Sequence, residues 1–262
     1  MGTKGSFGFI SCYWKVRFRG VLLLIVFHVF LYGCSGNLNP GSQHTSASTS
    51  EEGQEKIAPL APISRMARGF DDRTDRIIRL YGRAIKKGAR KYGFDWRFVL
   101  AIMKQESQFV TNATSQRGAH GLMQLMPVTR YEVAEALGYE HADLSHPRNN
   151  IAGGIYYYRK LYNLFDGAEV EERSRLALAA YNAGASRIYD AQNIVAYLGE
   201  IPLRWAAIRD ALPLLSKRYY TLHQHVWRDG KPRGGYFGDW QQTVNYVENV
   251  MDYYENYRHV LE

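Results

Sequence analysis

The 262-residue chain is 46% hydrophobic and 14% aromatic, enough apolar surface for a packed core in one or two domains. Its net charge of +8 suits an anionic polymer or a membrane surface, but no basic block interleaves with aromatic residues, and we predict no nucleic-acid partner. Both cysteines, Cys12 and Cys34, lie near the N-terminus, which excludes a disulfide framework and a cysteine-ligated zinc site from the remaining sequence.

The N-terminal segment has the order of a secretory signal peptide. Residues 1–20 contain four basic residues and no acid, and the apolar run that follows at 21–31 is short for a bilayer span. This run ends in Leu-Tyr-Gly-Cys, which resembles the lipobox of bacterial lipoproteins and implies cleavage before Cys34 and lipidation of that cysteine. Ser35 follows, and by the lipoprotein sorting rule this implies the outer membrane. An uncleaved signal anchor with an incidental cysteine is the alternative.

Three regions are expected along the chain. Residues 1–33 form the signal peptide, and 34–69 form a lipidated tether whose Ser, Gly, Thr, Gln and Asn content cannot offset its ordering entropy. Residues 70–262 form the single globular domain.

The sequence of this domain has helical periodicity, and few of its segments alternate with a period of two. Proline opens one expected helix and glycine ends several others. We therefore predict a mostly α domain with a Gly/Pro/Arg-rich loop around 229–238. Its helices are expected at Asp71–Tyr92, Trp96–Phe109, Pro127–Leu137, Asn149–Leu164, Glu172–Ala183, 202–214 and 240–259.

Glu106 is the candidate acid/base of this domain. It continues the apolar stripe of Val99, Ile102 and Met103 and sits near the C-terminus of its expected helix. Burial and the negative end of a helix both disfavour a carboxylate, so both favour the protonated form that a general acid requires. From position alone, an ordinary surface glutamate at a helix end is the alternative.

Four short motifs follow one another from Glu106 onward. Their order and spacing resemble those of the family 1 lytic transglycosylases over roughly residues 70–260. The resemblance implies a lysozyme-like (goose-type, SLT) helical fold, peptidoglycan glycan strands as substrate, and no cofactor or metal. The motifs are Glu106-Ser107, Gly121-Leu122-Met123-Gln124, Ala180-Tyr181-Asn182 and Tyr246-Val247.

The resemblance also implies roles for single residues beside Glu106. Tyr181 would lie against the Glu106 carboxyl and help to set its orientation and pKa, and Ser107 would support the same site. Plain core packing is the alternative for Met123 and Tyr246. The remaining expected contacts are Met123 and Gln124 along the glycan groove, Asn182 at a helix end, and Tyr246 closing the site from the last helix.

The segment from Trp205 to Tyr220, together with Tyr246-Val247-Glu248-Asn249, resembles the catalytic domain of the membrane-bound lytic transglycosylase F subgroup. Members of that subgroup usually carry a solute-binding-protein-like domain before the catalytic one. Only the short stretch after Cys34 precedes the first expected helix here, so we expect that domain to be missing.

The motifs contain no second acid, whereas most glycosidases use two carboxylates flanking the scissile bond. A single acid suits substrate assistance, in which Glu106 first donates a proton and the sugar then closes to a 1,6-anhydro product. If Asp95 or Asp143 folds into the cleft, hydrolysis remains open. The alternatives are therefore a muramidase on the same fold and a non-catalytic peptidoglycan-binding lipoprotein.

Overall fold

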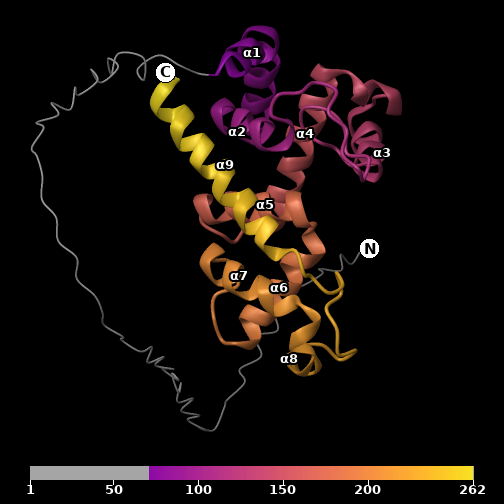
Figure 1. Cartoon of the computed structure of the whole chain (residues 1–262), viewed down its shortest axis with the longest axis vertical. Coiled ribbons are helices and arrows are strands. Elements are labelled where there is room, and N and C mark those ends of the chain that lie inside the picture. Colours follow the sequence, from indigo (N-terminus) through magenta and orange to yellow (C-terminus); the bar gives the residue numbers. More distant parts are fainter. Residues whose placement is uncertain (1–70, 262) are drawn as a thin grey trace, which may run out of the picture. The chain divides into compact units, whose positions relative to one another are not determined.

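The structure, a computed structural model, describes residues 71–261. Over this range the regular elements are helices (Figure 1), which confirms the mostly α prediction. The only β pairing within it is two isolated bridges at His120. The elements are α1 (Asp72–Tyr92), α2 (Trp96–Ser107), α3 (Pro127–Leu137), η2 (His141–Ser145), α4 (Pro147–Tyr162), η3 (Asn163–Phe165), α5 (Val170–Ala183), α6 (Ala185–Tyr197), α7 (Trp205–Ala211), η4 (Leu212–Leu215), η5 (Lys217–Tyr219), α8 (Tyr220–Val226) and α9 (Trp240–Val260).

Two helices, α6 and the short α8, were not expected from the sequence. Gly184 predicts the stop of α5, and it adopts φ 88° and ψ 141°, which turns the chain directly into α6. The buried stripe of α6, Ile188, Ala191 and Ile194, has ordinary helical spacing. The helical pattern was therefore present, and the glycine was a junction between two helices.

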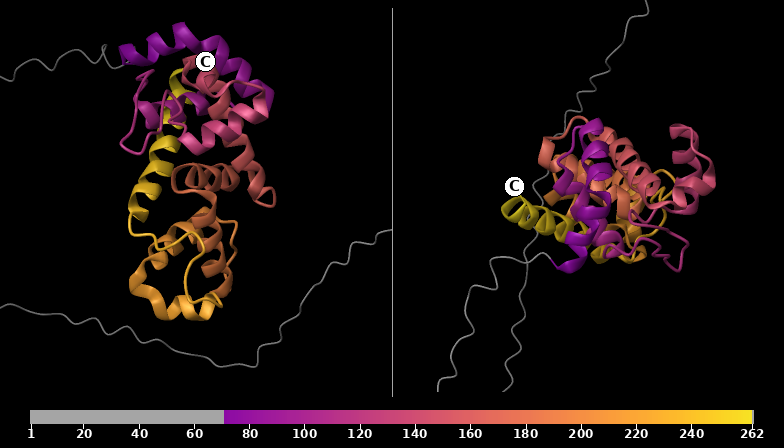
Figure 2. Two further views of the ribbon diagram at one scale, coloured as in Figure 1. Left: turned by 90° about the vertical axis from the view of Figure 1, so that its right-hand side faces the viewer. Right: turned by 90° about the horizontal axis from the view of Figure 1, so that it is seen from above.

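Helix α2 lies at the centre of the packing. Its N-cap, Asp95, accepts the backbone N–H of Arg97 at 2.9 Å, and every residue from Phe98 to Met103 is buried. Its most extensive helix contact is with α9, which also packs on α5 and reaches η4. Figures 1 and 2 show α9 running along the domain, from the part that holds α6, α7 and α8 to the part that holds α1 and α2.

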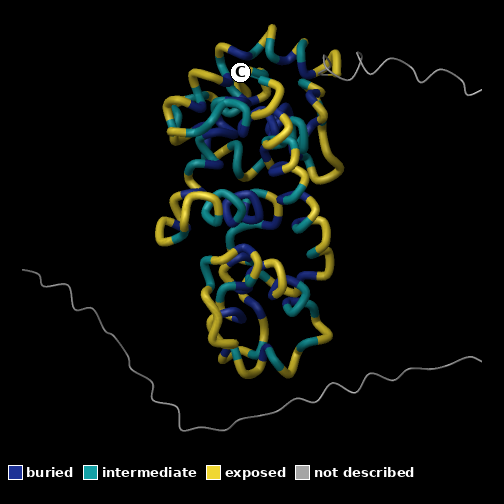
Figure 3. Tube along the Cα trace, turned by 90° about the vertical axis from the view of Figure 1, so that its left-hand side faces the viewer, coloured by how far each residue is buried: buried dark blue, intermediate teal, exposed yellow. Residues whose placement is uncertain are grey.

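The contacts between residues divide the chain into two units, and the second of these, Leu60–Glu262, contains the described residues. Its described residues supply a large hydrophobic core. The dark-blue stretches of the tube in Figure 3 mark the buried residues. We therefore expect this unit to fold on its own. Within residues 71–261, none of the helices has the length and apolarity needed to cross a membrane.

Gly154 on α4 provides a test of the packing beneath the motif loop, the non-helical segment 121–124 that contains the second motif. A Cβ there would overlap Cβ and Cγ of the fully buried Met123, so Gly154→Ala should lower the free energy of unfolding by about 1–3 kcal/mol in urea titrations. Gly82→Ala in α1 is the matched control. Its Cβ would lie 3.6 Å from Ile78, and the helix should gain up to about 1 kcal/mol. Equal effects of the two substitutions would contradict the close α4–Met123 contact.

Candidate active site

The site is built around the carboxyl of Glu106, in the last turn of α2. Part of the side chain remains accessible, while the surrounding protein removes most of the water from the carboxyl. This burial raises the pKa of Glu106 to about 8, and a hydrogen bond from Tyr246 acts in the opposite direction. Glu106 is therefore protonated at neutral pH.

Tyr246 is the hydrogen-bond partner of this acid. Its hydroxyl donates to Oε1 of Glu106 at 2.5 Å, and its side chain is 4% exposed. Burial and the neighbouring Glu106 raise the pKa of Tyr246 well above its ordinary range, so the phenol keeps its proton. The contact joins α2 to α9 and fixes the direction in which the acid points.

The backbone beside Glu106 is strained. Gln108 and Phe109 both have positive φ, 49° and 64°, and end α2 at Ser107, two residues before the expected end at Phe109. Gln124 has φ 44° in the motif loop. These are the non-glycine residues with positive φ in the described part of the chain. Gln108 and Phe109 come directly after the first motif, and Gln124 is the last residue of the second. Strain of this kind gathers at functional sites.

Ser107 ties the end of α2 to the motif loop. Its hydroxyl lies 3.1 Å from the carbonyl oxygen of Leu122 and 3.0 Å from that of Met103, so it can donate to either. The side chain is 7% exposed. Ser107 thus supports the loop next to Glu106 through the main chain.

Tyr181 holds the same loop from α5. Its hydroxyl donates to the carbonyl oxygen of Met123 at 2.7 Å, and burial followed by the charge of Glu106 raises its pKa well above the ordinary range. The sequence analysis predicted that Tyr181 would lie against the Glu106 carboxyl and orient it, and this prediction is wrong about the hydrogen bond. The charge of Glu106 affects the Tyr181 pKa, but the Tyr181 hydroxyl bonds to the loop, and Tyr246 bonds to the carboxyl.

The side chains of Met123 and Gln124 both make contacts within the protein itself. Met123 is fully buried in the core, as in the alternative of plain core packing and unlike the expected groove-lining position. The Gln124 amide nitrogen donates to the carbonyl oxygens of Ala113 and Gly121, at 3.0 and 2.9 Å. Both residues therefore shape the loop.

Asn182 makes a contact at the end of a helix. Its Oδ1 accepts the hydroxyl of Thr243 at 2.8 Å, which joins the last turn of α5 to the first turn of α9. The bond helps to place Tyr246, one turn further along α9.

Asn150 is the site-supporting residue that the sequence analysis missed. It is fully buried on α4, and its Oδ1 accepts the Met123 N–H at 2.8 Å. Its Nδ2 lies 3.0 Å from the His120 carbonyl oxygen and 3.2 Å from that of Leu144. In the sequence, Asn150 is a polar residue on the apolar side of an expected helix. That position could have indicated a buried side chain with hydrogen-bond partners.

Asp95 and Asp143, which could have supplied a second acid, are engaged elsewhere. Burial alone would raise the pKa of Asp95, but hydrogen bonds from Arg97 and Tyr254 lower it. Asp95 caps the far end of α2, about 16 Å along the helix from Glu106. Asp143 accepts the Glu140 N–H at the start of η2.

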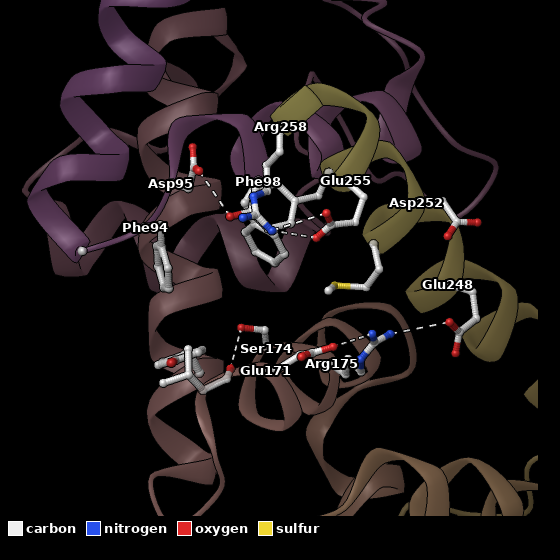
Figure 4. A pocket seen from close by; sticks show the side chains of 15 residues that line it. Phe94, Asp95, Phe98, Glu171, Ser174, Arg175, Glu248, Asp252, Glu255 and Arg258 are labelled. Carbon is white, nitrogen blue, oxygen red and sulfur yellow. Dashed lines mark hydrogen bonds and ion pairs between the residues drawn. The ribbon is translucent and has the colours of Figure 1, made fainter. Parts of the chain in front are cut away.

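A cavity of about 570 Å³ opens between α2, α5 and α9 (Figure 4), and Glu106 is not among the residues that line it. Its α9 residues lie on the side opposite Tyr246. Arg175 pairs with Glu171 and Glu248, and Arg258 pairs with Glu255. These ion pairs belong to a cavity that is separate from the site around Glu106.

Cys34, the signal peptide and the tether lie outside the described residues. Their assignments, including the domain limits 1–33 and 34–69, stay predictions.

Comparisons with known proteins show which families and structures this chain is similar to. Residues 83–200 match the family model described as "Transglycosylase SLT domain". The chain is 38% identical over 173 residues to "Membrane-bound lytic murein transglycosylase F" of Desulfosudis oleivorans, covering 65% of this chain and 35% of that protein. It is 30% identical over 225 residues to the protein of the same name from Vibrio parahaemolyticus, covering 84% and 38%.

The chain thus spans little more than a third of the length of these relatives. Among solved structures, the 70 kDa soluble lytic transglycosylase of Escherichia coli matches with a TM-score of 0.50 and 24% identity. That match covers 72% of this chain and 26% of the other, and it supports the lysozyme-like helical fold that the resemblance implied. Residues 83–200 of this chain are therefore similar to a transglycosylase SLT domain.

Proposed function

We propose that this chain is a peptidoglycan lytic transglycosylase. The observation that carries the proposal is the enclosed Glu106 carboxyl, with its pKa near 8 and its orientation set by Tyr246, in an SLT domain. The relatives are named for murein, and this supports the bond between N-acetylmuramic acid and N-acetylglucosamine as the target.

The proposed reaction needs one acid. Glu106 donates its proton to the glycosidic oxygen as the bond from C1 of the muramic residue to that oxygen breaks, and the sugar's own N-acetyl oxygen bonds to C1. The C6 hydroxyl oxygen then displaces the N-acetyl oxygen from C1. Its proton returns to the Glu106 carboxylate, which leaves a 1,6-anhydro end and restores the acid.

The other motif residues act on this centre mainly by positioning. Tyr246 holds the acid through its hydroxyl, whereas Ser107, Gln124 and Tyr181 hold the motif loop. We propose that substrate meets this loop chiefly at its main chain, because the Met123 side chain is buried.

We also propose that the protein is anchored in the cell envelope by lipid on Cys34 and faces the periplasm from the outer membrane. The basic–apolar–Cys order of the N-terminus supports this location, as do relatives named membrane-bound. Glycan strands and this membrane would be its partners.

Glu106→Gln tests the catalytic assignment. Peptidoglycan digested with the Leu60–Glu262 unit should yield 1,6-anhydro muropeptides by mass spectrometry, and the variant should lose on the order of a thousandfold or more in rate because no proton donor remains. Glu135→Gln, at an exposed position, should leave the rate unchanged. Reducing-end products would indicate a muramidase, and no products from the wild type would indicate a binding protein.

The raised pKa of Glu106 also predicts how the stability of the Glu106→Gln variant differs from that of the wild type as the pH changes. The Glu106 pKa rises from 4.5 to about 8 on folding, so the folded state binds more protons between these pH values, and the free energy of unfolding falls as the pH rises. Glu106→Gln removes this dependence. Its stability advantage over the wild type should therefore grow from pH 4.5 to 8 and then level off, as measured by urea unfolding. A difference independent of pH would contradict the raised pKa.

Tyr246→Phe and Tyr181→Phe form a matched pair. The Tyr246 hydroxyl lowers the pKa of Glu106, so its removal should shift the alkaline limb of kcat/KM, near pH 8 in the wild type, to higher pH and should reduce kcat. The Tyr181 hydroxyl bonds to the loop, so its removal should reduce activity without that shift. The reverse pattern would return the acid-orienting role to Tyr181.

A further inference from the structure

The positive charge of the described chain is concentrated on α1. This helix contains eight Lys and Arg residues against two acids, Asp72 and Asp75, both in its first turn. The remaining described residues are together nearly neutral. The net charge of the whole domain therefore comes from one helix.

These cations share one face. A helix advances about 100° per residue, which places all eight within an arc of about 140°. All eight are exposed, while Ile77, Ile85 and Ala89 on the other side are buried in the core. Leu80, 50% exposed, lies inside the same arc. We call this surface the basic face of α1; its cations are Arg73, Arg76, Arg79, Arg83, Lys86, Lys87, Arg90 and Lys91.

None of the ion pairs within residues 71–261 involves a cation of the basic face, and the one carboxylate inside the same arc is Asp72, in the first turn of α1. A hollow of about 790 Å³ on this face is lined by five cations, including Arg148 from α4, and by no acid or aromatic residue. Eight like charges on one helix repel one another. An anionic partner that approaches this surface reduces the repulsion between the cations, so its binding is electrostatically favourable.

We propose that the basic face of α1 docks this domain on the surface of an anionic phospholipid bilayer. Charge complementarity and shape support this partner. Helix α1 is about 30 Å long and lies at one end of the domain (Figures 1 and 2), so a planar surface can meet the whole row of cations at once. The exposed Leu80 can enter the headgroup layer. The hollow has no aromatic platform on which a sugar ring could stack.

Docking through α1 is separate from glycan cleavage, since the basic face contains none of the residues placed around Glu106. It would add an electrostatic contact to any lipid anchor, and a second contact of this kind makes membrane attachment stable. It would also fix how the domain faces the bilayer.

The experiment uses the Leu60–Glu262 unit without lipid and measures cosedimentation with vesicles. Binding is expected to phosphatidylcholine vesicles that contain phosphatidylglycerol, and not to pure phosphatidylcholine. It should be lost in about 1 M salt, where the screening length falls to about 3 Å. Equal binding to both vesicle types would overturn the proposal.

Two quadruple variants locate the surface. Each cation near an anionic bilayer contributes about fivefold, so replacing Arg76, Arg79, Arg83 and Lys87 with Gln should lower vesicle partitioning by more than about a hundredfold. These four make no side-chain hydrogen bond or ion pair within the described chain, and circular dichroism should show an unchanged fold. The matched control replaces four exposed cations elsewhere, Arg204, Lys217, Arg228 and Lys231, and should lose less than about fivefold.

Equal losses in the two variants would show a response to net charge alone and would overturn the proposal. If only binding to isolated peptidoglycan depends on α1, the partner is the wall and not the bilayer. The α1 variant should digest isolated peptidoglycan at the wild-type rate. Failure of the proposed glycan cleavage would leave the vesicle results unaffected, so the two claims are tested separately.

Discussion

The chemistry of this domain depends on keeping water away from one carboxyl. Burial of Glu106 at the end of α2 disfavours its ionised form, and the hydrogen bond from Tyr246 partly restores that form while fixing the carboxyl in space. The balance leaves a pKa near 8, high enough to hold a proton at neutral pH and low enough to release it in the proposed glycan cleavage. The extensive contact between α2 and α9 maintains this balance, because it brings both residues into one enclosed space.

The remaining motif residues serve the acid mainly through the backbone. Ser107 and Tyr181 bond to main-chain carbonyls of the motif loop, and Asn150 receives one of its N–H groups. Gln124 closes the loop on itself in a strained conformation. A loop fixed in this way presents a constant surface next to Glu106, and such preorganisation avoids rearrangement during the reaction.

Local patterns predicted much of this arrangement. The helical periods located seven of the helices, and the apolar stripe through Val99 and Met103 placed Glu106 on the buried side of α2. The sequence did not show which tyrosine bonds to the acid or that α2 ends at Ser107. It also did not indicate Asn150. Each of these depends on residues far apart in the chain, and the positive φ of Gln108 and Phe109 has no signature in residue type.

The most direct test of this account is a site-specific titration of Glu106 by carbon NMR of side-chain carboxyl groups, with Glu106→Gln to assign the resonance. The account predicts a midpoint near pH 8, far above the exposed glutamates of the same domain. A midpoint near the ordinary glutamate value of 4.5 would show that Glu106 is ionised at neutral pH, and would contradict its role as the proton donor.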